Sequence, residues 1–188
     1  ICLGGQAAVI DNVVKPLLVG RDPFFREAIW QAMNERQRLH KGTLSDRALA
    51  TVDMALWDLA GRALNVPVYK LLGATRTKVP AYASTMCGDD LPGGLSTPEE
   101  FATFALACKQ RGYPGFKLHT WQPPISWAPD PKMDVAACAA VREAVGADIK
   151  LMLDPFHFYS REQARFLGRE LEKLDYHWIE EPMDEQSM

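Results

Sequence analysis

The fold is decided by residues 149–181, which read IKLMLDPFHFYSREQARFLGRELEKLDYHWIEE. Residues 149–154 are apolar on both faces, as is typical of a strand in a sheet covered by helices. Ser160 and Gln163 have the spacing of a helix N-terminal cap, and apolar residues then recur at helical spacing. Residues 177–181 (HWIEE) read as a second strand. The stretch therefore predicts a strand–helix–strand unit with parallel strands.

The same alternation extends toward the N-terminus. Strands are expected at 79–85 (VPAYAST) and 115–120 (GFKLHT). A capping box at 97–100 opens the helix between them, and Asp130-Pro131 opens a helix that Gly146 ends. No Asn-Gly hairpin separates the strands, so the four are expected to be parallel.

Two architectures agree with this alternation, an open doubly wound sheet and a (β/α)8 barrel. A dinucleotide-binding open sheet needs a Gly-rich turn after its first strand. Residues 88–94 (GDDLPGG) do not match G-x-G-x-x-G, and their two aspartates would repel a phosphate. A dinucleotide site is therefore not expected.

The first 78 residues are predicted to be mostly helical. One helix is expected over 22–39, with Asp22 as its N-cap and Pro23 in its first turn. A second is expected to begin at Ser45 and to end at Asn65 and Pro67. This change of pattern predicts two domains, 1–78 and 79–188.

The composition is that of a globular protein: 188 residues, 47% hydrophobic, 24% charged, with a net charge of −3. No apolar run approaches membrane-spanning length, and no basic stripe indicates a nucleic-acid partner. We expect neither a membrane nor a nucleic acid as partner. The chain opens on Ile1 without signal-peptide features, and we expect a cytoplasmic location with Cys2, Cys87, Cys108 and Cys138 as reduced thiols.

Candidate chemistry lies where the predicted strands end. Lys117 and His119 are two residues apart and therefore point to one side of their strand. Asp154 ends the next strand, and Glu180-Glu181 ends the last. In a barrel these side chains would converge, with carboxylates suited to Mg²⁺ and a basic group able to remove a proton from carbon. Taken singly, each residue also has an ordinary structural interpretation, as a solvated charge or a helix cap.

Three stretches carry a family resemblance: residues 50–73 (ATVDMALWDLAGRALNVPVYKLLG), residues 154–182 with their closing Glu-Glu-Pro, and Lys117-x-His119. Together they resemble the mandelate racemase/muconate lactonizing enzyme family of the enolase superfamily. The resemblance implies an α/β fold, an enolase-like TIM-type (β/α) barrel. Residues 79–188 would form its first four β/α units, and residues 1–78 the helical part of an α+β capping domain.

The resemblance also implies roles for single residues. Asp154 and Glu180 would be Mg²⁺ ligands, with Glu181 the less favoured of the two glutamates. Lys117 would lie near the substrate carboxylate. His119 stands where many relatives have a second lysine, the base that takes the α-proton, and an imidazole can do the same work.

A further departure from the family lies just after Asp154. The family usually has Asn or His two residues later, facing the ligand, but this chain has Phe156, which cannot hydrogen-bond a substrate hydroxyl. His157 is a candidate for that place, and a histidine of a surface loop is the alternative.

The implied activity is Mg²⁺-dependent removal of a proton α to a carboxylate, with the enolate stabilised. The expected enzyme is an acid-sugar dehydratase (a lyase) that forms a homo-oligomer; the alternatives are a hydroxy-acid racemase or epimerase and a non-catalytic relative. A complete barrel takes about 250 residues and eight strands. The chain is therefore expected to be an interior segment, inactive alone, with the third metal ligand and a second acid/base group outside it.

Overall fold

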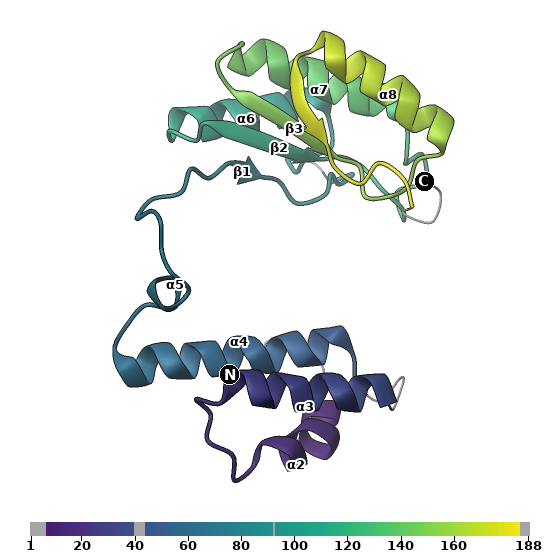
Figure 1. The fold of residues 1–188 in the computed structure, drawn as a ribbon. Helices are drawn as coiled ribbons and strands as arrows, with labels where there is room; N and C mark the ends of the chain where they lie inside the picture. The colour runs from purple at the N-terminus through teal and green to yellow at the C-terminus, as the bar shows by residue number, and fades with distance from the viewer. Residues whose placement is uncertain (1–6, 40–43, 92, 185–188) are drawn as a thin grey trace. The chain divides into compact units, whose positions relative to one another are not determined.

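The computed structural model describes residues 7–39, 44–91 and 93–184. The chain divides into two compact units, Ile1–Thr77 and Lys78–Met188 (Figure 1). In the part of the chain that the structure describes, no helix has the length and apolar character needed to cross a bilayer.

The first unit is helical, as predicted. Its elements are α1 (Ala7–Val9), the π-helix η1 (Ile10–Val14), α2 (Lys15–Leu18), α3 (Arg26–Leu39), α4 (Asp46–Leu64) and α5 (Val68–Leu71). Helices α3 and α4 lie side by side (Figure 1), and Ile29, Met33, Val52 and Leu56 are among the core residues between them. The predicted limits of α4 are confirmed: the Ser45 hydroxyl accepts from Ala48 N, and Asn65 ends the helix at φ 53°.

The predicted N-cap at Asp22 is wrong, because α3 begins only at Arg26. The Asp22 carboxylate accepts a hydrogen bond from Phe24 N at 2.9 Å, and the Asp22 carbonyl accepts one from Phe25 N at 3.1 Å. These bonds close a tight turn over 22–25. Asp at the first and Pro at the second position also favour a type I turn, so the same residues serve a turn instead of a helix start.

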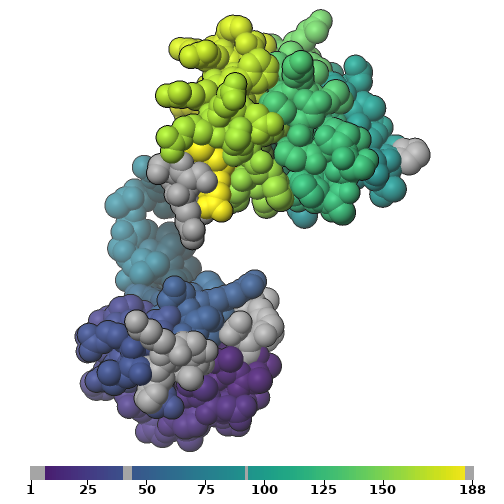
Figure 2. All heavy atoms as spheres, turned by 90° about the vertical axis from the view of Figure 1, so that its right-hand side faces the viewer, coloured from purple at the N-terminus to yellow at the C-terminus, as the bar shows by residue number. Residues whose placement is uncertain are grey.

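The second unit is a parallel sheet covered on one face by helices. Its strands are β1 (Ala83–Ser84), β2 (Gly115–His119), β3 (Lys150–Asp154) and β4 (Tyr176–Ile179), adjacent in that order. Helices α6 (Pro98–Gln110), α7 (Pro131–Val145) and α8 (Arg161–Lys173) follow β1, β2 and β3. They cover one face of the sheet (Figure 1), and in Figure 2 the teal, green and yellow-green parts of the second unit lie next to one another. This sequential parallel order is that of the start of a β/α barrel, as predicted.

The side chains between sheet and helices form the core of the second unit. Leu118, Leu151 and Leu153 point into it and are completely buried. Leu118 lies between Lys117 and His119, so the alternation along β2 turns those two side chains toward the other face. The predicted helix caps are confirmed at Thr97 and Ser160, each within a capping box.

The first strand is shorter than the predicted 79–85. Only Ala83 and Ser84 pair with β2, opposite Phe116 and Lys117. Strand β2 begins at Gly115, directly after Pro114, which has no N–H to donate to a ladder. In this register residues 79–81 lie beyond the first residue of β2 and have no partner on that strand.

Candidate active site

Four predicted side chains meet at the carboxyl ends of β2, β3 and β4. His119 is paired directly with Asp154 in the β2–β3 register. His119 Nε2 lies 2.9 Å from Asp154 Oδ2. Lys117 Nζ lies 3.2 Å from Asp154 Oδ2 and 2.8 Å from Glu180 Oε2. The structure therefore brings together Lys117, His119, Asp154 and Glu180.

The ammonium of Lys117 is buried between the two carboxylates. Burial is the largest single influence on its pKa and lowers it, but hydrogen bonds to Glu180 and then Asp154 more than offset this. The pKa of Lys117 is therefore raised above its ordinary value, and the side chain is a fixed positive charge at the site.

The His119 ring is oriented by residues at the end of β1. Its Nδ1 lies 2.7 Å from the carbonyl oxygen of Thr85, which can only accept a hydrogen bond. Nδ1 therefore carries a hydrogen, and in the neutral ring Nε2 is the atom that can take up a proton. The Thr85 hydroxyl also accepts from His119 N at 2.8 Å. Phe156 packs against the ring, with 5.1 Å between centroids.

Backbone groups and an indole position the two carboxylates. Asp154 Oδ1 accepts from Phe156 N at 3.2 Å. Glu180 follows β4, and its own N–H donates to the Leu153 carbonyl at 2.8 Å. Trp178 Nε1 donates to Glu180 Oε2 at 3.3 Å. Both carboxylates are therefore held by the strands that carry them.

The donor set fits a magnesium ion in part. Asp154 and Glu180 direct oxygens at one cation, the Lys117 ammonium. Mg²⁺ is commonly bound through one or two carboxylates, with water or substrate oxygens completing its shell. Within residues 7–39, 44–91 and 93–184, no group of three or more His, Cys, Asp or Glu side chains is placed to hold a metal. The described residues thus supply two oxygen ligands of the kind Mg²⁺ takes.

The structure places His157 against Glu181. Its Nε2 lies 2.8 Å from Glu181 Oε2, and its backbone N–H donates to the Glu181 carbonyl at 2.8 Å. Phe156, His157 and Glu181 all have positive φ, at 57°, 63° and 43°. Such strain at bulky residues is typical of functional sites. The pair ties the segment after β3 to the segment after β4.

Sequence reasoning missed two contributors to this region. Thr85 fixes the ring of His119. Its position at the end of a predicted strand, where the other site residues also lie, is the sequence signal that indicates it. Asp134 of α7 is buried and accepts hydrogen bonds from the Thr120 and Tyr159 hydroxyls. The sequence marks Asp134 only as an acidic residue in a first helical turn, which is common. Of the four cysteines, Cys87, Cys108 and Cys138 are free thiols, and Cys2 lies outside the described residues.

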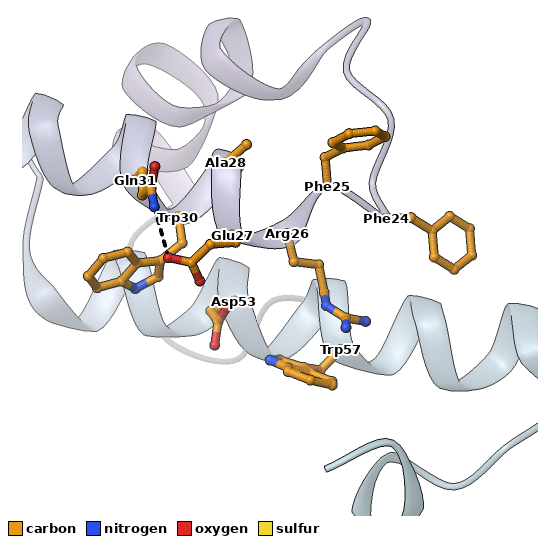
Figure 3. A pocket seen from close by; sticks show the side chains of 9 residues that line it. All are labelled: Phe24, Phe25, Arg26, Glu27, Ala28, Trp30, Gln31, Asp53 and Trp57. Carbon is orange, nitrogen blue, oxygen red and sulfur yellow. Dashed lines mark hydrogen bonds between the residues drawn. The ribbon is translucent and has the colours of Figure 1, made fainter.

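A separate groove lies on the first unit, between α3 and α4 (Figure 3). The Arg26 guanidinium covers the Trp57 ring, 3.7 Å from its centroid, and Gln31 donates to Glu27 at 3.1 Å. The nine side chains drawn in Figure 3 include no histidine, cysteine or serine. Its charged side chains are those of Arg26, Glu27 and Asp53, whereas the histidine, lysine and carboxylate group described above lies in the second unit.

Two family descriptions match the chain. Residues 3–73 match "Mandelate racemase / muconate lactonizing enzyme, N-terminal domain", and residues 100–188 match "Enolase C-terminal domain-like". The D-galactonate dehydratase of Klebsiella pneumoniae is 34% identical over 95% of this chain and 46% of its own length. The chain therefore spans about half the length of the curated relatives it matches.

Solved structures of similar proteins include magnesium-bound ones. A D-glucarate dehydratase from Agrobacterium tumefaciens, complexed with magnesium, is 62% identical with a TM-score of 0.92, over 96% of this chain and 47% of that one. A racemase from Streptomyces coelicolor with bound magnesium is 32% identical with a TM-score of 0.80, over 97% of this chain and 49% of that one.

Proposed function

Since the chain belongs to the mandelate racemase/muconate lactonizing enzyme family of the enolase superfamily, we propose that it supplies the base and two metal ligands of an acid-sugar dehydratase. The observation that carries the proposal is the group formed by His119, Asp154, Glu180 and Lys117. An imidazole, two carboxylates and a buried ammonium at one sheet edge are the parts that α-proton removal from a carboxylate requires.

His119 is the proposed base. The Thr85 carbonyl holds Nδ1 in its protonated form, so Nε2 accepts the proton from the substrate α-carbon. The imidazolium formed in this step is stabilised by the Asp154 carboxylate, 2.9 Å from Nε2. The Asp154 carboxylate therefore balances the charge of the imidazolium, and the Thr85 carbonyl orients the ring.

Lys117, and a metal ion held by the two carboxylates, would stabilise the negative charge that develops on the substrate. As the α-proton leaves, negative charge moves onto the substrate carboxylate. Burial lowers the pKa of Lys117, but its acidic neighbours raise it by more, so the net pKa is raised. The ammonium therefore stays charged and can pair with the substrate carboxylate. A Mg²⁺ ion held by Asp154 and Glu180 would act there as a Lewis acid.

The proposed outcome is loss of water. His119 takes the proton from the α-carbon. The hydroxyl on the β-carbon leaves as water with a proton returned by the His119 imidazolium or supplied by a second acid outside this chain, and the resulting enol becomes a 2-keto-3-deoxy acid. Likeness to a D-glucarate dehydratase at 62% identity and to D-galactonate dehydratases supports a sugar acid as substrate. D-Glucarate is the first substrate to test.

A racemase or epimerase is the second candidate, supported by likeness to the Streptomyces racemase. It would share the α-proton removal and differ in returning a proton to the opposite face. A non-catalytic relative would need neither step nor the metal.

One experiment separates the three candidates. The full-length protein is incubated with D-glucarate and Mg²⁺ in deuterated water and followed by proton NMR. A 2-keto-3-deoxy acid supports the dehydratase. Deuterium at the α-carbon of a recovered or inverted acid supports the racemase. Neither product from any sugar acid, together with no Mg²⁺ binding by calorimetry, indicates a non-catalytic relative.

A further inference from the structure

A buried carboxyl on helix α7 joins two segments that flank the site. Asp134 is only 1% exposed, and its Oδ2 accepts from Thr120 Oγ1 at 2.6 Å and from Tyr159 OH at 2.5 Å. Thr120 and Tyr159 are themselves buried. The proposed reaction uses none of these three side chains directly.

The two hydroxyl donors stand next to the reacting groups along the chain. Thr120 directly follows His119 at the end of β2. Tyr159 closes the segment that begins at Asp154, and its backbone N–H donates to the Pro182 carbonyl at 3.1 Å, beyond β4. One carboxyl oxygen of Asp134 thus connects the chain segments after β2, β3 and, through Tyr159, β4.

We propose that Asp134 is a positioning residue. Through the hydroxyls of Thr120 and Tyr159 it sets the placement of the His119 imidazole relative to the Asp154 segment. The inference rests on the proposed function for its kinetic consequences, whereas its structural consequence can be measured without substrate.

The chemistry of Asp134 fits a neutral acceptor. Burial raises the pKa of Asp134 to about 7, although the hydrogen bonds from Thr120 and Tyr159 lower it. Both hydroxyls use Oδ2, and among the described residues the buried Oδ1 has no hydrogen-bond partner. An asparagine could therefore keep both bonds through its single amide oxygen.

The same helix offers a matched control at its other end. Arg142 donates to the carbonyls of Gly146, Ile149, Leu174 and Asp175. These residues precede β3 and β4, at the sheet edge opposite the site. Arg142 is eight residues, or about 12 Å of helix, from Asp134. Arg142 therefore joins two chain segments, as Asp134 does, but these segments lie away from the reacting groups.

The kinetic test compares Asp134→Asn, Asp134→Ala and Arg142→Met in the full-length protein. We expect Asp134→Asn to keep kcat within about threefold. Asp134→Ala should lower kcat by about 10–100-fold with a smaller change in KM, because misplaced catalytic groups slow the chemical step. Arg142→Met should lose thermal stability and keep kcat. An unchanged kcat in Asp134→Ala, or an equal loss of kcat in Arg142→Met, would overturn the inference.

Two near-isosteric variants serve if Asp134→Ala fails to fold. Thr120→Val and Tyr159→Phe each remove one hydroxyl donor and leave the packing volume almost unchanged. Each variant should lower kcat several-fold, and added Mg²⁺ should restore kcat in neither variant. Wild-type kcat in both variants would contradict the positioning role.

Amide hydrogen exchange without substrate separates this inference from the proposed function. Asp134→Ala should speed amide exchange in residues 119–122 and 155–159 and leave exchange in residues 146–150 unchanged. Arg142→Met should speed exchange in residues 146–150 and leave the other two ranges unchanged. If no sugar acid reacts but this pattern appears, the proposed function fails and the positioning inference stands. If sugar acids react but the two variants give the same pattern, the positioning inference fails.

Discussion

His119 and Asp154 are opposite each other in the β2–β3 register, with His119 Nε2 2.9 Å from Asp154 Oδ2. The proposed base and a proposed metal ligand therefore depend on a single parallel pairing. A slip of one residue would turn one of these side chains to the opposite face of the sheet. The buried leucines on the other face, Leu118 and Leu153, oppose such a slip, so the apolar core maintains the site geometry.

Asp154→Asn should abolish most Mg²⁺ binding and turnover and leave the fold intact. The amide keeps the shape and one oxygen but loses the charge that a divalent cation needs. We expect Mg²⁺ affinity to fall by at least about tenfold in a calorimetric titration, with an unchanged circular dichroism spectrum. Asp148→Asn, at an exposed position before β3, is the control and should bind Mg²⁺ normally. Near-normal metal affinity and turnover in Asp154→Asn would show that the ligand assignment is wrong.

Lys117→Met should separate metal binding from catalysis. The ammonium lies within 3.2 Å of both proposed ligand carboxylates, so its removal relieves repulsion of a divalent cation. We expect Mg²⁺ affinity to rise by about three- to tenfold and kcat/KM to fall by about 100-fold, because the substrate carboxylate loses its cationic partner. Lys150→Met, an exposed lysine at the start of β3, should change neither quantity. Weaker Mg²⁺ binding in Lys117→Met would argue against a shared cation position.

Much of this site could be predicted from the sequence, because it follows from strand geometry. The two-residue period of a strand places Lys117 and His119 on one face, and parallel strands bring Asp154 and Glu180 to the same edge. Helix starts at Thr97 and Ser160 were predictable because each capping box is local in sequence.

Features that depend on distant partners could not be predicted. Asp22-Pro23 suits both a helix start and a tight turn, so the local sequence pattern alone does not select the turn. The Thr85 carbonyl acts on His119 through a contact 34 residues away. Asp134 resembles any acid of a first helical turn until the Thr120 and Tyr159 hydroxyls are seen to meet it. The roles of His157 and the other site residues stay predictions.

The buried Asp134 predicts how stability changes with pH. Its pKa is raised from 3.8 to about 7 because burial disfavours the charged form, so between about pH 4 and 7 the folded protein binds more protons than the unfolded chain. Its contribution to stability is therefore greatest at low pH and is lost as pH rises toward 7.

Asp134→Asn should remove this dependence, because an amide does not titrate. The free energy of unfolding of Asp134→Asn, relative to wild type, should rise by about 3 kcal/mol between pH 4.5 and pH 8 in urea denaturation. Asp148→Asn, which replaces an exposed carboxyl, controls for the loss of one acidic group. A constant difference between Asp134→Asn and wild type would show that Asp134 does not change protonation in this range.

The most direct test of the central proposal is solvent exchange of the substrate α-proton by His119→Asn. The full-length variant is incubated with D-glucarate and Mg²⁺ in deuterated water, beside wild type and His177→Asn, an exposed histidine of β4. We predict that His119→Asn binds Mg²⁺ and substrate as wild type does but loses at least about 100-fold in α-proton exchange and elimination, whereas His177→Asn keeps both. Wild-type exchange in His119→Asn would contradict the assignment of His119 as the base.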